Sequence, residues 1–259
     1  VSWALGFEYI ELTQVGATDR YNITFTNTSY IGLYNITFYA NDSAGNLNNT
    51  QTTNFTVRDS TSPVINSHNA TPNSTVYGNN ITIYANVTDN VGVSNVYVEI
   101  NGSNNTLTPT GGDWYNYEFN TIDYAVGLYT YKIYANDTNN NWAITQTDTF
   151  EILQASSDLH LYLNGLESNY SVNEDTTVNI TGMLTIPPSS PDLIQIYKNG
   201  SLIGNTSSPV TNLSTHQPGL YNITAIYVGN INYTENIVTW YLEVNDTTTP
   251  NVTNLYPQG

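Results

Sequence analysis

The sequence contains no cysteine and very few basic residues. Without a Cys among its 259 residues, the chain can form neither disulfides nor thiolate metal sites. Four Lys and Arg residues stand against 21 Asp and Glu, which gives a formal net charge of −17. The basic residues are isolated from one another, whereas contact with phosphate groups needs clusters of them. We therefore expect neither nucleic acid nor anionic lipid as a partner, while divalent cations stay compatible with this charge.

Long apolar runs and the residues typical of helices are scarce as well. No stretch approaches the roughly 18 apolar residues of a membrane span, and Val1 opens directly on strand-like sequence, as in a mature protein or an excised piece. In their place stand 39 Asn, 38 Thr and 22 Tyr. Thr and Tyr suit strands, whereas Asn suits turns and solvated faces. An all-β protein is the expected fold class.

Groups that could carry catalysis do not cluster in the sequence. His68, His160 and His216 fall at unrelated points without a partner at metal-ligand spacing, and Glu174-Asp175 lies in a turn-like run. No nucleophile elbow, P-loop or dinucleotide fingerprint occurs. We expect no enzymatic activity and, calcium apart, no cofactor.

An internal repeat organises the chain. Its three copies are GLYNITFYANDSAGN (Gly32–Asn46), GLYTYKIYANDTNNN (Gly127–Asn141) and GLYNITAIYVGNINY (Gly219–Tyr233). The first glycines of successive copies are 95 and 92 residues apart, which fits a seven-stranded β-sandwich of about 100 residues.

Within each copy, apolar and polar residues alternate with the period of a strand. In the first copy Tyr34, Ile36, Phe38 and Ala40 are expected to face a core, and Asn35, Thr37 and Asn41 to face water. The turn residues after the strand predict a hairpin with a second apolar strand, which we expect to be the last hairpin of each sandwich.

The repeat, followed by the linker D-x-T-x-P at Asp59–Pro63 and Asp246–Pro250, resembles the bacterial and archaeal immunoglobulin-like repeats of cell-surface proteins, particularly those of archaeal surface proteins. The resemblance implies tandem immunoglobulin-like β-sandwiches, which short Pro-containing linkers would arrange as a rod. Predicted boundaries are 1–58 for a module that lacks its opening strands, 59–153 and 154–245 for complete modules, and 246–259 for the opening strand of a further module or a donor strand.

Such modules occur in proteins of several functions. The interpretation we favour is an extracellular structural protein of the cell surface, a subunit or segment of a filament, sheath, layer or stalk, whose copies associate with one another. The alternatives are an adhesin or carbohydrate-binding array that recognises surface glycans, and a non-catalytic spacer of a larger secreted enzyme.

The chain contains 22 Asn-Xaa-Ser/Thr sequons. In strands that alternate polar and apolar residues, such sequons arise even where no glycosylation takes place, because Asn and Thr then share the outer face. The alternative is dense N-glycosylation. The sequons we select as glycosylation candidates are Asn22, Asn35, Asn54, Asn80, Asn86, Asn136, Asn179, Asn199, Asn222 and Asn232.

Acidic residues at module ends raise the question of calcium. Asp59, Asp89 and Asp246 offer carboxylate oxygens near predicted turns, but each loop contributes a single Asp and Ca²⁺ needs six to eight oxygens. A site would therefore have to be assembled from neighbouring loops. The competing interpretation is that these residues cap turns.

Trp114 presents a similar choice, since it is expected to lie opposite Tyr115, Tyr117 and Phe119 on its strand. An exposed Trp could stack on a sugar ring, whereas burial over a module edge is the commoner outcome.

The last residues, DTTTPNVTNLYPQG, align with Asp59 onward and predict the opening strand of another sandwich. Residues 1–58 lack such strands, so we expect either that the tail of one copy adds a strand to the head of the next, or that the chain is a window of a longer covalent array. Pro250, Val252 and Leu255 are the expected linking residues.

Overall fold

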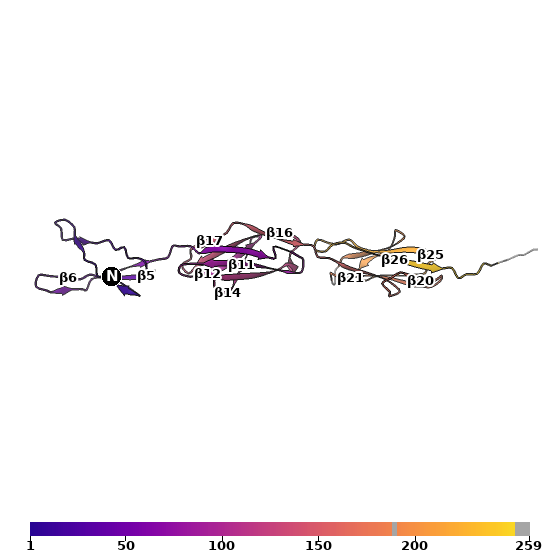
Figure 1. Ribbon diagram of the computed structural model, residues 1–259, viewed down its shortest axis with the longest axis horizontal. Helices are drawn as coiled ribbons and strands as arrows, with labels where there is room; N and C mark the ends of the chain where they lie inside the picture. Colours follow the sequence, from indigo (N-terminus) through magenta and orange to yellow (C-terminus); the bar gives the residue numbers. More distant parts are fainter. Residues whose placement is uncertain (188–190, 252–259) are drawn as a thin grey trace, which may run out of the picture. The chain divides into compact units, whose positions relative to one another are not determined.

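The computed structural model describes residues 1–187 and 191–251, and these residues form β-strands joined by turns (Figure 1). One short 3-10 turn, Thr121–Asp123, interrupts the strands of the described chain. The expectation of an all-β fold is confirmed. Among the described residues, no helix is long and apolar enough to cross a membrane. Val252 and Leu255 lie outside the described residues.

The middle part of the chain folds into two sheets. One has the order β10-β18-β16-β12-β13 with β17 beside β16, and the other has the order β14-β15-β11-β9. The strands are β9 (Val64–Thr71), β10 (Ser74–Val76), β11 (Asn80–Thr88), β12 (Val93–Ile100), β13 (Ser103–Thr106), β14 (Thr108–Gly111), β15 (Trp114–Asn120), β16 (Gly127–Asp137), β17 (Trp142–Ile144) and β18 (Asp148–Leu153). This division, three central strands β12, β16 and β18 in one sheet against β9, β11, β14 and β15 in the other, is the immunoglobulin topology.

The following part repeats the pattern with sheets β20-β26-β25-β22-β23 and β19-β21-β24. Its strands are β19 (Asp158–Leu163), β20 (Tyr170–Asn173), β21 (Val178–Ile186), β22 (Leu193–Lys198), β23 (Ser201–Ser207), β24 (Val210–Ser214), β25 (Gly219–Tyr227) and β26 (Asn236–Asn245). In both parts a short early strand pairs in parallel with the last strand, β10 with β18 and β20 with β26. The chain therefore contains tandem immunoglobulin-like sandwiches.

Alternation along the strands builds the cores. On β11 the side chains of Ile81, Ile83, Ala85 and Val87 are at most 1% exposed, while the Thr, Tyr and Asn residues between them are half-buried. The apolar set of each strand faces the opposite sheet, and the polar set faces outward. Burial of these apolar faces is the main favourable term in the folding of each sandwich.

The glycine of the Gly-Leu-Tyr that opens each repeat copy adopts the same backbone conformation three times. The glycines Gly32, Gly127 and Gly219 have φ angles of 143°, 148° and 150°, which side chains disfavour. The hydroxyls of Tyr129 and Tyr221 donate to the carbonyl oxygens of residues 125 and 217, at 2.8 Å in both cases. This bond to the backbone four residues upstream is the tyrosine corner of immunoglobulin-like domains.

In the first copy the same hydroxyl is used with the opposite polarity, since the Tyr34 hydroxyl accepts from the backbone N–H of Tyr30 at 3.0 Å. The predicted hairpins are confirmed for all three copies, because β16 pairs antiparallel with β18 and β25 with β26, and in the first copy β5 (Gly32–Thr37) pairs with β8 (Thr52–Val57).

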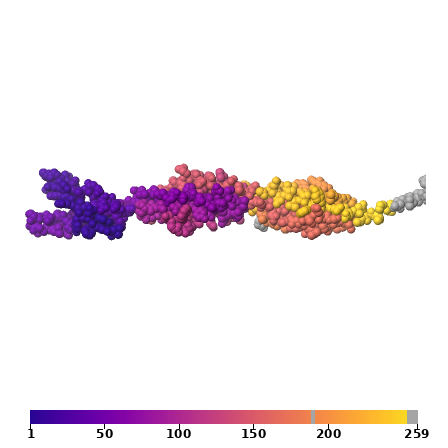
Figure 2. Space-filling view, in the orientation of Figure 1, coloured from indigo at the N-terminus to yellow at the C-terminus, as the bar shows by residue number. Residues whose placement is uncertain are grey.

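Residues 1–58 supply one sheet of this pattern. β1 (Ser2–Trp3) and β2 (Gly6–Phe7) complete the order β2-β1-β5-β8, which matches β13-β12-β16-β18. Two small hairpins, β3 (Thr13–Gln14) with β4 (Tyr21–Asn22) and β6 (Ala40–Asn41) with β7 (Leu47–Asn48), stand apart from each other in Figures 1 and 2.

The core of residues 1–58 is correspondingly small. Tyr34 is its one fully buried apolar side chain, stacked on Phe55 at 5.0 Å between ring centroids. The expectation that Phe38 and Ala40 face a core is wrong, because β5 ends at Thr37 and Phe38 is 42% exposed. No second sheet lies against these two residues within 1–58, so their apolar side chains stay in contact with solvent.

Contacts divide the chain into two compact units. The first comprises Val1–His68, Tyr84–Tyr117 and Lys132–Thr147, and the second Asn69–Ile83, Glu118–Tyr131 and the residues from Asp148 on. Strands β9, β11, β15 and β16 contribute residues to both. The module boundaries drawn from the repeat, like the rod, stay predictions.

Truncation of a core residue on β16 should destabilise the middle sandwich. Ile133 is fully buried, so Ile133→Ala is expected to lower the free energy of unfolding by about 2–5 kcal/mol through lost burial and an unfilled cavity. Leu128→Ala, on the same strand but 66% exposed, should change it by no more than about 0.5 kcal/mol. Urea denaturation followed by circular dichroism measures both, and equal effects of the two substitutions would contradict this account of the core.

Candidate functional site

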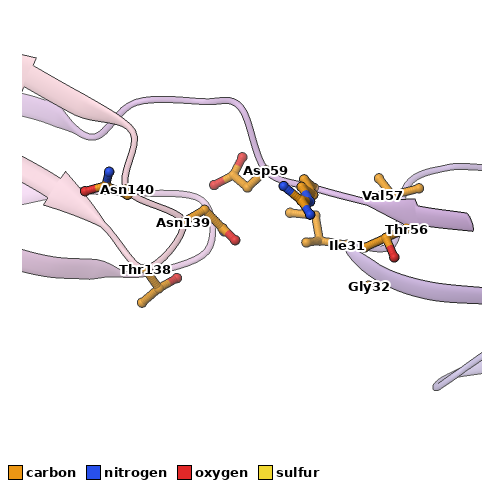
Figure 3. Close-up of a pocket in the computed structure, with 9 residues that line it drawn as sticks. Ile31, Gly32, Thr56, Val57, Asp59, Thr138, Asn139 and Asn140 are labelled. Atoms are coloured by element: carbon orange, nitrogen blue, oxygen red, sulfur yellow. The ribbon is translucent and has the colours of Figure 1, made fainter.

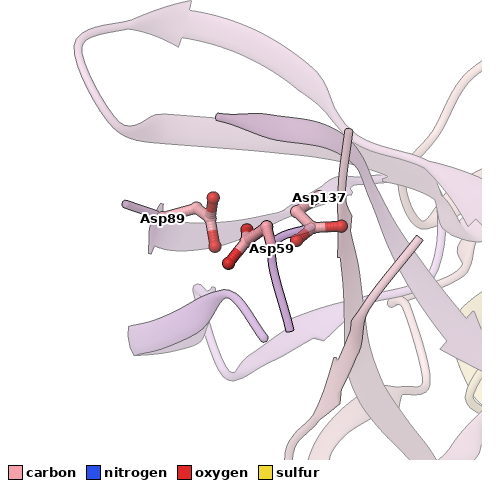
Figure 4. Close-up of side chains that lie close together, drawn as sticks. All are labelled: Asp59, Asp89 and Asp137. Carbon is pink, nitrogen blue, oxygen red and sulfur yellow. The ribbon is translucent and has the colours of Figure 1, made fainter. Parts of the chain in front are cut away.

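Three aspartates from separate segments meet at one end of the middle sandwich. Asp59 lies between β8 and β9, Asp89 directly follows β11, and Asp137 is the last residue of β16. In an immunoglobulin topology the chain entering the first strand and the loops after the second and sixth strands lie at the same end. One carboxylate oxygen of each aspartate lies within 4.8 Å of the others, and Figure 4 shows the Asp59 carboxylate between those of Asp89 and Asp137. All three belong to the first compact unit.

Each of these carboxylates holds its own loop through one oxygen. Asp137 Oδ1 accepts from the backbone N–H groups of Asn139 and Asn141, at 2.9 and 2.8 Å. Asp89 Oδ1 accepts from the N–H groups of Val91 and Gly92, at 2.8 Å each. The turn-capping interpretation of the sequence therefore accounts for the Oδ1 atoms.

The other oxygens are used differently. Asp137 Oδ2 accepts from the side-chain amide of Asn141 at 2.7 Å. The Oδ2 atoms of Asp59 and Asp89 are buried and have no hydrogen-bond partner among the described residues. Asp59 is 8% exposed and Asp137 is 1% exposed, so water screens this negative charge poorly.

Two asparagines bind Asp59 into the cluster. The Asn90 amide donates to Asp59 Oδ1 at 3.3 Å, and the Asn141 amide donates to the Asp59 carbonyl oxygen at 3.2 Å. Burial alone would raise the pKa of Asp137, but hydrogen bonds from the Asn141 side chain and from the backbone N–H groups of Asn141 and Asn139 bring that pKa below its usual value. These hydrogen bonds therefore favour the ionised form of Asp137.

The structure places the sequence-predicted metal residues in two locations. It brings Asp59 and Asp89 together and adds Asp137, which belongs to the loop Tyr-Ala-Asn-Asp-Thr-Asn-Asn-Asn, one of the loops expected to offer oxygens at module ends. Asp246 is exposed, caps its own turn by accepting from the Thr248 N–H at 2.9 Å, and lies outside the cluster. The signal for Asp137 was present as the Asp of Tyr-Ala-Asn-Asp, but nothing local distinguished it from Asp42 in the first copy.

Asp42 indeed repeats the Asp137 loop without its neighbours. Its Oδ1 accepts from the backbone N–H groups of Ala44 and Asn46 at 2.9 and 2.8 Å, and its Oδ2 from the Asn46 amide at 2.7 Å. The hydrogen bonds from Asn46 lower the pKa of Asp42. Asp42 is exposed, and within the described chain it joins no acidic cluster.

A pocket of about 480 Å³ lies near the cluster and is lined by Ile31, Gly32, Thr56, Val57, Arg58, Asp59, Thr138, Asn139 and Asn140 (Figure 3). Its lining combines aliphatic side chains with amides and one carboxylate. No nucleophile paired with a base is found among these residues, so the pocket does not present the arrangement that acyl or phosphoryl transfer requires.

The sequon asparagines differ in exposure. Asn22, Asn35, Asn54, Asn80 and Asn199 are exposed, and Asn86, Asn179, Asn222 and Asn232 are half-buried. Asn136 is only 8% exposed, so the folded chain presents its amide poorly to a modifying enzyme, and its glycosylation stays a prediction. Some sequons also have a structural use, since the hydroxyls of Thr181 and Thr224 donate to the side-chain oxygens of Asn179 and Asn222, at 3.0 and 2.7 Å.

Two further sequence candidates can now be placed. Trp114 is 44% exposed, so the expectation that burial is its commoner outcome is wrong here; it opens β15 next to a turn and faces away from the core. Two of the three histidines, His160 and His216, have different surroundings. His160 lies between Glu167 and Asp158, with ring nitrogens 2.7 and 3.1 Å from carboxylate oxygens, and His216 is 6% exposed.

The match to a family model agrees with the topology of the middle sandwich. Residues 63–133 match a family model described as the bacterial Ig domain. The tetra-tandem repeat in the extending region of a large adhesion protein is 15% identical, with a TM-score of 0.43, and the match covers 89% of this chain and 62% of that one. No curated protein matches the chain.

Two further structures give weaker likenesses. Fibronectin(III)-like modules of Clostridium thermocellum CbhA are 16% identical, with a TM-score of 0.31, and the match covers 73% of this chain and 100% of theirs. The Yersinia pseudotuberculosis adhesin InvE is 12% identical, with a TM-score of 0.33, and the match covers 68% of this chain and 58% of that one. Together the topology and the family match define the class as a protein of tandem immunoglobulin-like repeats.

His160 and His216 should titrate on opposite sides of the ordinary imidazole pKa of about 6.5. The hydrogen bond to Glu167 raises the pKa of His160 against desolvation, and Asp158 raises it further. Burial, and then the charge of Lys198, lower the pKa of His216. The His160 contribution to stability is therefore present below about pH 6.5 and lost as pH rises through its folded value. The His216 contribution is present above about pH 6.5 and lost as pH falls through its lower folded value.

NMR titration of the ring resonances, assigned with His160→Gln and His216→Gln, measures the two midpoints. A His160 midpoint at or below that of His216 would contradict this description of their surroundings.

Proposed function

We propose that this chain is a non-catalytic structural segment of an extracellular cell-surface protein, a part of a filament, sheath, layer or stalk. The observation that carries the proposal is where the fold places the apolar and the polar side chains. Apolar side chains fill sandwich cores, and the outer faces of the strands carry Asn and Thr rather than charged groups. The surface that results is polar, acidic and poor in basic groups, as suits exposure to the outside of a cell.

The dense sequons support the same location. Where their asparagines are exposed, N-linked glycans would hydrate the surface and hinder proteases. Attachment of sugars to Asn-Xaa-Ser/Thr takes place on chains that leave the cytosol, so occupancy would place the protein outside.

Glycopeptide mass spectrometry of the natural protein tests this location. Exposed sites such as Asn22, Asn54 and Asn199 are expected to carry glycans and buried Asn136 none, because folding hides its amide. Biotinylation of intact producing cells should label the protein as strongly as labelling after lysis. An unmodified mass together with labelling only after lysis would overturn the extracellular assignment.

We further propose that copies associate head to tail through residues 1–58. Leu5, Phe7 and Tyr9 are 80%, 70% and 77% exposed in this part of the chain, and Phe7 and Tyr9 form an aromatic pair 5.5 Å apart. An edge strand and exposed aromatic side chains together are suited to accept an added strand. The donor would be the segment from Asp246 on. It shares the Asp-x-Thr-x-Pro sequence of Asp59–Pro63, which precedes β9 in the middle sandwich.

Sedimentation velocity across a concentration series tests the association. Phe7→Ser combined with Tyr9→Ser, and separately deletion of residues 246–259, are each expected to leave monomers under conditions where the unaltered chain forms larger species. As a matched control, Leu213→Ser with Leu220→Ser removes two leucines that are 67% and 65% exposed elsewhere, and should not alter association. Association that survives the deletion would refute strand donation.

The carbohydrate-binding alternative has one observation in its favour, the exposure of Trp114. Binding on a glycan array that Trp114→Ala abolishes would replace the structural proposal with an adhesive one.

A further inference from the structure

The Asp59, Asp89 and Asp137 carboxylates pose an electrostatic problem that the fold alone does not solve. Three oxygens that carry negative charge lie within 4.8 Å of one another in a largely buried location. Like charges at this distance repel strongly where water is excluded. Among the described residues, none of the three carboxylates forms an ion pair with Lys or Arg.

Hydrogen bonds within the loops explain only part of the arrangement. The Oδ1 atoms hold the turns, so an Asp or an Asn would serve equally well in that role. The Oδ2 atoms of Asp59 and Asp89 are buried without any hydrogen-bond partner in the described chain. A buried carboxylate oxygen without a partner is costly, and the Asp59 side chain is more than nine-tenths buried. Figure 4 shows the Asp59 carboxylate between those of Asp89 and Asp137.

We infer that Asp59, Asp89 and Asp137 bind a divalent cation, and that this cation is calcium. Carboxylates are hard oxygen ligands, which favour Ca²⁺ over metals that prefer His or Cys. A single Ca²⁺ with oxygens about 2.3–2.6 Å away spans about 4.6–5.2 Å between opposite ligands, which accommodates the separations of the three carboxylate oxygens. The ion would satisfy the two orphan oxygens and offset the repulsion.

Such an ion would join three segments that are distant in sequence. Asp59 belongs to the chain that enters β9, Asp89 to the loop between β11 and β12, and Asp137 to the turn between β16 and β17. Calcium would therefore stabilise this end of the sandwich by linking the segment before β9 to two loops. The inference is independent of the proposed function, since it concerns binding and stability wherever the protein resides.

The chain contains its own control for this site. Asp137 and Asp42 form the same loop, with two backbone donors on Oδ1 and an Asn amide 2.7 Å from Oδ2. Asp137→Asn and Asp42→Asn therefore disturb equivalent hydrogen bonds, and they differ in that Asp137 alone lies in the carboxylate cluster.

Isothermal titration calorimetry of the full chain with CaCl₂, after removal of metal with EDTA, measures the binding. We expect one site on the unaltered chain and on Asp42→Asn with a Kd in the range of about 10⁻⁴–10⁻³ M, typical of extracellular modules. Asp137→Asn and Asp89→Asn should each weaken it at least about tenfold, because the number of charged ligands sets the affinity of calcium sites. Calcium should raise the unfolding temperature of the first two proteins and not that of the latter two.

Circular dichroism in EDTA checks that all four proteins fold, so a loss of binding cannot arise from unfolding. In EDTA, Asp89→Asn should be at least as stable as the unaltered chain, since it removes one of three repelling charges. Absence of calcium binding by the unaltered chain, binding that Asp89→Asn and Asp137→Asn leave intact, or binding of MgCl₂ but not CaCl₂ would each overturn the inference.

Discussion

The burial of one apolar face of each strand against an opposing sheet is the interaction on which this protein depends. With no cysteine and only four basic residues in 259, neither disulfides nor extensive ion pairing can share the task. Core residues such as Ile83, Ile133 and Leu161 are fully buried, whereas the residues beside them in the strands are polar. Every second side chain of a strand faces outward and does not pack in the core. The residues at these positions can therefore favour solubility, and many of them are Asn and Thr.

That division also determines how much of the fold the sequence predicts. Alternation and turn chemistry are local, so the strands and final hairpins of the repeats could be located before the structure was known. The Gly-Leu-Tyr motif acquires its explanation only in three dimensions, where the glycine adopts a positive φ and the Tyr hydroxyl binds the backbone. Phe38 shows where local reasoning fails, because alternation predicts which face is apolar but not whether another sheet covers it.

The candidate site was predicted in part for the same reason. Asp59 and Asp89 could be selected as turn residues with carboxylates at module ends, and the need to assemble a site from neighbouring loops could be stated. Which loops are neighbours depends on the crossing of strands between the two sheets, and no local pattern encodes it. The topology groups Asp137 with them and leaves Asp246 elsewhere.

Asp42 and Asp137 together show how a repeat acquires a site without changing its motif. The same three side-chain hydrogen bonds close the same turn in both copies, so the turn alone selects an Asp at this position. The difference comes from outside the motif: Asp59 and Asp89 approach Asp137, and nothing equivalent approaches Asp42 within residues 1–58. A capping residue becomes a metal ligand when the opening segment and the second loop of its own sandwich are both present.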